Sequence, residues 1–414
     1  MGNKQAIYDA RLKRVADAVA LREPDRVPIV PIFQAFPVFY QNKWNIKDLL
    51  EDYHRATDVY DHFYTHFEPD MGWDPTLFFP IDYMERSGIT WFRWPGKHFD
   101  DVNTMYQYIE GEYMTADEYP EAIRDITRFM MHKWLPRSFS KLSGLSQIEF
   151  RNSMWFGHMG LFASFSNPEV RAAFDTLFET GKIVADFFAY VDEYRAHMKE
   201  KFGMPPIFAS LAFAPFDMIG DTLRGTEPIL MDMYEHPDEL LEFIDVVTEF
   251  AIADMIAASE GRGVPYVYFW LHKGVDKFMS NEHFAKFYWP SLQKCIFALV
   301  DAGRTPVIYA EGAYNNRLEF FRDVPKGKVV FDFEYTDMDK AKKILGDNSC
   351  IMGNVPAFTL SYGTKQETVD YCKWLIDTCA PGGGYILDTA TMVDDAKPEN
   401  IEAMFETVFT YGAK

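Results

Sequence analysis

Polar side chains follow several short apolar runs in the second half of the chain, at the point where each run ends. They are His272, Tyr309, Glu311, Asp332, Glu334, Asn354 and Asp388. Carboxyl groups crowded in an apolar cup have raised pKa values and can supply a proton near neutral pH. Carboxylates and a histidine can also hold a zinc ion. The residue types therefore indicate proton transfer or metal binding, if the fold brings these side chains together.

The segments around these residues predict such a fold. Five short runs rich in β-branched or aromatic residues are typical of buried strands, and they cover residues 264–270, 306–309, 328–331, 350–352 and 384–387. Longer amphipathic segments, typical of helices, lie at 280–301, 314–323, 337–345 and 364–379. An alternation of strand and helix repeated this often predicts a parallel sheet with crossover helices.

Three earlier segments bring the predicted strands to eight, and they cover residues 27–33, 76–79 and 206–213. Eight such units predict an α/β fold, a (β/α)8 TIM barrel, in which the carboxyl ends of the strands form one rim that carries the active site. An N-terminal helix is expected at 7–21 and long helices at 167–201 and 237–258. We interpret residues 1–414 as one domain, with an inserted hairpin and helical elaboration at roughly 80–165; the hairpin is expected at 87–100.

Composition excludes several classes of protein. The net charge is −21 and no basic run occurs, which argues against nucleic-acid binding and against anionic membrane surfaces. No apolar run approaches the roughly 20 residues of a membrane span, and the N-terminus lacks the apolar region of a signal peptide. The 4 cysteines form no CxxC pair, so we expect a cytoplasmic protein. Aromatic residues make up 17% of the chain, which suits a pocket for flat ligands.

Five segments, found in the right order, resemble the superfamily of uroporphyrinogen decarboxylase and the corrinoid-dependent methyltransferases. They are residues 11–28, 221–237, 279–292 (MSNEHFAKFYWPSL), 345–356 and 384–404. Together these segments span most of the chain. The resemblance implies a TIM barrel, in agreement with the alternation of strands and helices.

Two departures from the superfamily narrow the expected reaction. The decarboxylase binds a polycarboxylate porphyrinogen through arginines after the first strand, but residues 34–40 (QAFPVFY) contain no cation, so we expect no polyanionic substrate. The thiol-activating methyltransferases bind zinc through a His-x-Cys after a mid-barrel strand and a Cys after the last strand. Tyr309, Ala310 and Glu311, and about Thr391, occupy those positions here. Without the sulfur ligands, a zinc site built for a thiolate is not expected.

The oxygen-rich rim that remains suits a corrinoid methyltransferase of the O-demethylase type. Such an enzyme moves a methyl group from an aryl methyl ether to the cob(I)alamin of a corrinoid protein, and the leaving oxygen needs a proton or a Lewis acid. We expect Glu311, Glu334, Tyr309 and Asp217 to be catalytic. As a second option, His272, Glu311 and Glu334 hold zinc. The expected contacts of the aryl ring and the cofactor are Phe33, Phe36, Phe213, Trp270, Asn354 and Asp388.

Other interpretations stay open. The chain contains no Asp-x-His-x-x-Gly motif for corrinoid attachment, so the cobalt is expected to arrive on a separate protein. One alternative function is a decarboxylase or other lyase acting on a small carboxylic acid, and another is a non-catalytic corrinoid-binding barrel. His272 can also be a satisfied loop histidine, and the carboxylates can be solvated loop residues. The methyl donor, the metal and the oligomeric state are left undetermined, with a homodimer as one option.

Overall fold

Six short parallel strands form the centre of the structure, a computed structural model that describes residues 2–413. The strands are β3 (Ser210–Phe213), β4 (Tyr266–Leu271), β5 (Thr305–Ala310), β6 (Val330–Phe333), β7 (Cys350–Met352) and β8 (Tyr385–Ile386). Each pairs in parallel with the next along the chain, so the sheet order is the sequence order. This order confirms the predicted strand–helix alternation, although β6 lies two residues later than expected.

Two irregular extended segments close the sheet into a barrel. Ile29 bridges in parallel to Leu387 beyond β8, and Gly72 bridges in parallel to Pro206 ahead of β3. The Asp70 N–H donates to the Ile29 carbonyl at 2.8 Å and joins the two segments to each other. The eightfold TIM barrel is therefore confirmed.

The second strand was expected at the wrong place. Residues 76–79 do not form a strand, because Pro75–Leu77 is a 3-10 turn whose Asp74 side chain accepts from the Thr76 N–H. A proline at the first position and an aspartate before it are the usual start of a helical turn. The second barrel segment instead runs through Gly72.

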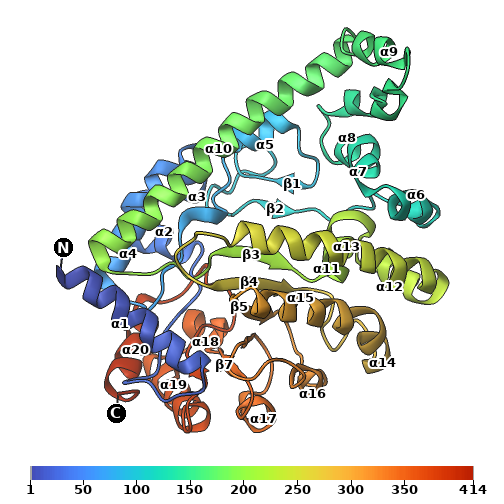
Figure 1. The fold of residues 1–414 in the computed structure, drawn as a ribbon. Helices are drawn as coiled ribbons and strands as arrows, with labels where there is room; N and C mark the ends of the chain where they lie inside the picture. Colours follow the sequence, from blue (N-terminus) through green and yellow to red (C-terminus); the bar gives the residue numbers. More distant parts are fainter. Residues whose placement is uncertain (1, 414) are drawn as a thin grey trace.

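The longer helices cover the barrel and connect its strands (Figure 1). They are α1 (Gly2–Val19), α4 (Ala56–His66), α10 (Pro168–Phe202), α12 (Thr226–Glu235), α13 (Pro237–Ala258), α15 (Trp289–Asp301), α17 (Met338–Leu345), α19 (Lys365–Cys379) and α20 (Pro398–Thr410). The capping box that opens α19 at Thr364 and Glu367 is confirmed. Within residues 2–413, no helix is both long and apolar enough to cross a membrane.

Short helical segments fill the connections. The α-helical ones are α2 (Phe36–Gln41), α3 (Ile46–Glu51), α5 (Ile81–Ser87), α6 (Tyr119–Arg124), α7 (Ile126–Phe129), α8 (Leu135–Ser138), α9 (Gly157–Ser164), α11 (Pro215–Ile219), α14 (Asn281–His283), α16 (Leu318–Phe321) and α18 (Ala357–Tyr362). The π-helical ones are η4 (Met130–Trp134), η7 (Gly220–Arg224) and η8 (Phe284–Tyr288). The predicted helix at 314–323 is reduced to the single turn of α16.

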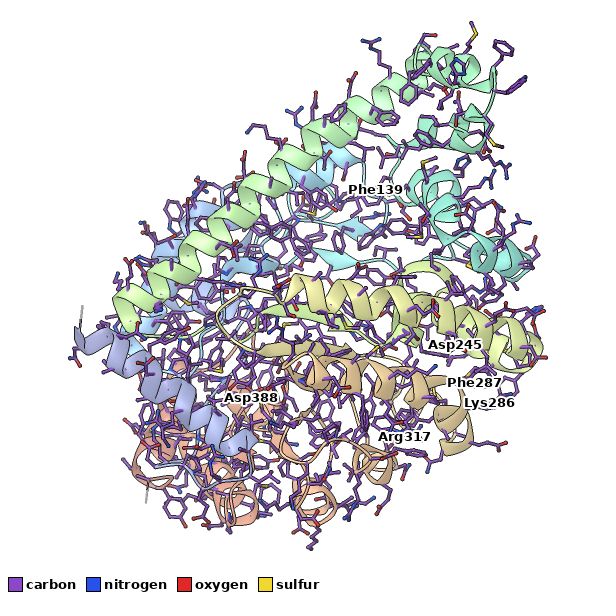
Figure 2. The ribbon with its side chains drawn as sticks, in the orientation of Figure 1. Phe139, Asp245, Lys286, Phe287, Arg317 and Asp388 are labelled. Atoms are coloured by element: carbon purple, nitrogen blue, oxygen red, sulfur yellow. The ribbon has the colours of Figure 1, made fainter. Side chains whose placement is uncertain are left out.

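The elaboration has a small apolar core of its own, separate from that of the barrel. This core contains Met84, Ile89, Phe92, Trp94, Phe139, Leu142, Leu145 and Ala173, and Phe139 lies beneath α10 in Figure 2. The hairpin expected within 87–100 is wrong, because β1 (Phe92–Arg93) pairs antiparallel with β2 (Gln107–Tyr108) across a longer loop. The interpretation of residues 1–414 as one domain stays a prediction.

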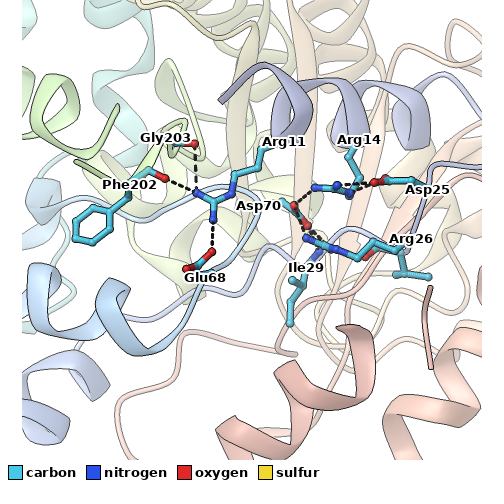
Figure 3. Close-up of polar contacts among 10 residues, drawn as sticks. Arg11, Arg14, Asp25, Arg26, Ile29, Glu68, Asp70, Phe202 and Gly203 are labelled. Atoms are coloured by element: carbon cyan, nitrogen blue, oxygen red, sulfur yellow. Dashed lines mark hydrogen bonds and ion pairs between the residues drawn. The ribbon is translucent and has the colours of Figure 1, made fainter. Parts of the chain in front are cut away.

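An ion-pair network holds the N-terminal end of the barrel together (Figure 3). The Asp70 side chain has no exposed surface and accepts from Arg14 at 2.6 Å, from Arg26 at 2.7 and 2.8 Å, and from the Ile29 N–H at 2.9 Å. These bonds join α1, the first barrel segment and the second. They lie at the end of the barrel opposite the catalytic rim, where side chains serve stability.

Candidate active site

A histidine with two acidic neighbours stands at the carboxyl end of β4. His272 Nδ1 lies 2.6 Å from Asp221 Oδ2, and His272 Nε2 lies 3.7 Å from Glu311 Oε2. The backbone N–H of His272 donates to Asp217 Oδ2 at 3.0 Å. The His272 side chain is 30% exposed, so the imidazole can be reached from the mouth of the barrel.

These neighbours keep His272 protonated. Burial works to lower the pKa of His272, but the hydrogen bond and charge of Asp221, together with the charges of Glu311 and Asp217, raise it to about 9. The pKa of Asp221 stays below its ordinary value in spite of burial, because His272 and Lys273 stabilise its charge. At neutral pH the pair is therefore an imidazolium and a carboxylate.

The turn after β3 positions the two aspartates. Pro215 starts α11 directly after the strand, and Asp217 lies in the first turn of this helix. Asp221 follows one turn later, in the π-helical segment η7, a type of helix irregularity that is frequent at functional sites. Asp217 is fully buried and accepts from the N–H groups of His272 and Lys273 and from the Tyr288 hydroxyl. Asp217 therefore holds the loop after β4 rather than facing a ligand.

A buried lysine completes the cluster. Lys273 Nζ donates to Asp221 Oδ1 at 2.6 Å and lies 3.5 Å from Glu110 Oε1, while its side chain is only 4% exposed. The lysine stem passes over Gly220, where an added Cβ would lie 2.4 Å from Lys273 Cε. A larger residue at that position would displace the lysine from Asp221. Asp221 binds His272 with one oxygen and Lys273 with the other.

Sequence reasoning missed both Asp221 and Lys273 as functional residues. Two signals were present. Asp221 follows Asp217 by four residues, the spacing that places two side chains on one face of a helix. Lys273 is the direct neighbour of the predicted His272.

Glu311 and Glu334 extend the acidic side of the mouth. Burial raises the pKa of Glu311, with help from the charge of Glu334 and against the pull of the His272 cation. Burial also raises the pKa of Glu334, whose carboxylate accepts from the Gly312 N–H. Gly312 has a φ of 88°, which only glycine adopts without strain. The structure therefore brings His272, Glu311 and Glu334 to one rim, as predicted.

Aromatic rings stand beside the histidine. The Phe213 ring centroid lies 5.9 Å from that of Trp270 and 5.9 Å from that of His272, and all three side chains are partly exposed. Phe33 and Phe36 were expected on the same wall, but they are buried against Phe63 of α4. The first barrel segment turns these two rings into the core, so that part of the prediction is wrong.

Comparison with known proteins places this barrel in a family. The family model of uroporphyrinogen decarboxylase (URO-D) matches residues 164–411, more than half of the chain. The protein belongs to the URO-D family. Among curated proteins, no match to this URO-D protein was found.

A solved structure supports the fold. A methyltransferase from Methanosarcina mazei superposes with a TM-score of 0.62 and 15% identity over 97% of this chain and 99% of that chain. At this identity the likeness shows the fold alone. A B12-independent methionine synthase from Shewanella sp. W3-18-1 matches with a TM-score of 0.35 and 11% identity over 53% of this chain and 64% of that chain, too weakly to support an argument.

Four of the predicted site residues lie beneath the rim of the URO-D barrel. Asp388 and Asp332 are fully buried, and Asp388 lies in the interior of the molecule, away from α12 and α14 (Figure 2). Burial raises the pKa of Asp332 to about 7 and that of Asp388 well above its ordinary value. Tyr309 is buried and its hydroxyl donates to the Ala390 carbonyl at 3.3 Å. Asn354 donates to the carbonyls of Glu334 and Thr336. Asp388 accepts from the backbone N–H groups of Ile32 and Thr389. The expected ligand contacts of Asp388 and Asn354 are thus replaced by structural bonds.

The donor set proposed for zinc does not fit the metal. Between residues 2 and 413, no group of three or more His, Cys, Asp or Glu side chains is placed to hold a metal ion. Zinc at His272 Nε2 would also have to displace the proton that Asp221 and Glu311 favour on this imidazole. The mouth of this URO-D protein is therefore arranged to hold a proton.

Proposed function

We propose that this URO-D protein transfers a methyl group from a methoxylated aromatic compound to the cob(I)alamin of a separate corrinoid protein, with His272 as the proton donor to the leaving oxygen. One observation carries the proposal. A histidine cation, held by Asp221 and close to Glu311, stands beside the partly exposed rings of Phe213 and Trp270 at the mouth of the barrel. The family and the fold of the M. mazei methyltransferase support a barrel that can serve this reaction.

The proposed step balances in electrons and protons. Cob(I)alamin is the second substrate and supplies both electrons of the new cobalt–carbon bond. The bond between the methyl carbon and the oxygen breaks, and its electron pair stays on the oxygen, which takes a proton from His272 Nε2 and leaves as a phenol. A phenol has a pKa of about 10, close to the value of about 9 for His272, so the transfer is nearly even in free energy. Water then reprotonates the neutral imidazole.

The remaining residues have supporting roles in this proposal. Asp221 orients the imidazole and stabilises its positive charge, and Lys273 keeps Asp221 ionised. Glu311 stays close to Nε2, the nitrogen that faces away from Asp221. Phe213 and Trp270 pack against the aryl ring, since flat apolar rings pair favourably. His272 is the catalytic residue and Asp221 a positioning residue.

The charge of the mouth disfavours the lyase alternative. The cations of His272 and Lys273 are outnumbered by the acidic side chains that surround them, which are Glu110, Asp217, Asp221, Glu311 and Glu334. An acidic mouth repels a substrate carboxylate, whereas a neutral ether meets no such penalty.

The proposal is tested by incubating the purified protein with a methoxyarene and chemically reduced cobalamin at high concentration. We expect methylcobalamin, followed by its absorbance, and an equal amount of the phenol. A methyl alkyl ether is the matched control and should react far more slowly, because its leaving alkoxide is more basic and it lacks the ring. Release of carbon dioxide from a small carboxylic acid without cobalamin would instead support a lyase.

The rate of methyl transfer is expected to fall as the pH rises through about 9. Only the protonated form of His272 donates, and the pKa of His272 is raised to about 9, so the active form is complete below that pH and lost above it. Asp221→Asn removes the strongest interaction that raises this pKa. In this variant we expect the rate to fall at a lower pH than in the wild type. The measurement is kcat against pH at saturating substrate. If kcat falls at the same pH in both proteins, the titrating group is not His272.

A further inference from the structure

The outer end of α10 carries a large exposed apolar surface. We call it the arm tip, and it consists of Met154, Trp155, Phe156, Met159, Phe162 and Phe178. Trp155 is 89% exposed and Met154 81%, and the other four are between 64% and 74% exposed. In Figure 1, α9 stands at the far end of α10, away from α1 and both chain termini. Residues 154–166 contain no Asp, Glu, Lys or Arg.

The size of this surface points to a protein interface. A Phe, Tyr or Trp side chain buries about 150–250 Å², so four aromatic and two methionine side chains at these exposures present roughly 800 Å² of apolar surface. A stable interface of standard size buries about 800 Å² on each partner. Exposed apolar patches above about 300–600 Å² mark interaction sites in soluble proteins.

The same chain offers an apolar groove. It lies between the helices of the elaboration and those that follow β3, and it has a volume of about 520 Å³. Ile126, Met130 and Met131 line one wall, and Met218, Leu223 and Phe250 line the other. Methionine side chains adapt their shape to an inserted group. The groove thus matches the arm tip in chemistry.

We propose that two copies of this chain form a dimer in which aromatic side chains of each arm tip insert into the apolar groove of the other copy, while the remaining tip residues pack around the mouth of that groove. One tip and one groove per chain allow a reciprocal exchange, which closes with twofold symmetry and leaves no free tip. The interface consists of two identical contacts. Met218 and Leu223 line the groove and lie next to Asp221 in the helical segment formed by α11 and η7. The groove therefore lies on the other side of this segment from His272, which Asp221 binds.

Two other occupants fit less well. An anionic membrane attracts basic residues, but the arm tip has none and the chain carries a net charge of −21. A corrinoid protein that delivers cobalt must dissociate after each transfer, and interfaces of that transient kind are small and polar. Large apolar interfaces belong to permanent complexes. A second copy is the occupant that combines permanence with a matching groove.

The first test is the oligomeric state of the full chain by sedimentation velocity. We expect the wild type to sediment at twice the chain mass of 48.1 kDa, and the double variant Trp155→Glu, Phe156→Glu to dissociate at least about 100-fold more readily, since interface anchors dominate binding. The matched control is Phe358→Glu, which changes a 74% exposed phenylalanine on α18 and should leave the dimer intact. A monomeric wild type, or a dimer unaffected by the arm variants, would overturn the proposal.

The second test locates the arm tip. The four native cysteines are all buried, so a pair introduced as Phe156→Cys and Thr127→Cys is selectively oxidised. Thr127 lies on the groove. We expect a cross-linked band at twice the chain mass with the pair and none with either single variant. If both thiols are consumed without that band, the tip folds onto the groove of its own chain. If the thiols stay unreacted, the tip lies away from both grooves. Either result contradicts the proposed exchange. Binding of a monomer through its arm tip to anionic vesicles or to a corrinoid protein would also contradict the proposed dimer.

Discussion

Replacing His272 by glutamine is expected to lower kcat for methyl transfer by about 10²–10⁴-fold, the usual loss when a general acid is removed. Glutamine can still donate a hydrogen bond to Asp221, but it has no proton to give to a phenoxide. In the proposed function Phe213 and Trp270, not His272, hold the aryl ring, so KM should change little. The measurement is the initial rate of methylcobalamin formation with a saturating methoxyarene.

The leaving group provides the sharpest control for this prediction. A phenol that carries electron-withdrawing groups has a lower pKa and leaves without a proton, so the loss caused by His272→Gln should shrink as the phenol becomes more acidic. His283→Gln is the matched histidine control, since His283 lies on α14 and makes an edge-to-face contact with Tyr234. An equal loss for all leaving groups would mean that His272 supports the site without donating a proton.

Replacing Asp70 by asparagine is expected to lower the free energy of unfolding by about 3–5 kcal/mol, the loss found when one partner of a buried ion pair is removed. Asp70 has no exposed surface and neutralises both Arg14 and Arg26 (Figure 3). Asparagine has nearly the same shape but no charge. The largely buried guanidinium of Arg26 would then lose the carboxylate that neutralises it, and Arg14 would keep only the exposed Asp25. The measurement is urea unfolding at neutral pH, compared with the wild type.

Glu68→Gln is the control for this second prediction. Glu68 pairs with Arg11 in the same region, but the Glu68 side chain is 68% exposed, and Arg11 keeps its bonds to the carbonyls of Phe202 and Gly203. We expect a loss of about 0–1 kcal/mol, as for solvent-screened ion pairs. The kcat of folded Asp70→Asn should match the wild type, because Asp70 lies at the end of the barrel opposite His272. A stability loss as small as that of Glu68→Gln, or an altered pH profile, would contradict the structural role assigned to Asp70.

The sequence by itself determined the architecture. The alternation of short apolar runs with amphipathic segments predicted a barrel, and α13 and β7 have the predicted bounds. These signals succeed because hydrophobic periodicity and helix capping act over a few residues. For the same reason, polar residues placed directly after strands led to His272, Glu311 and Glu334, since strand ends in a parallel barrel meet at one rim.

Only the tertiary structure decided which of the polar residues face the mouth. Asp388 and Asn354 also follow strands, yet they lie beneath the rim, because strand register and tilt set the depth of each side chain. The partner of His272 is Asp221, 51 positions earlier in the chain. The second barrel segment likewise pairs with distant backbone, at Ile29 and Pro206. Contacts over such separations form when the chain closes into the barrel, and local sequence patterns do not contain them.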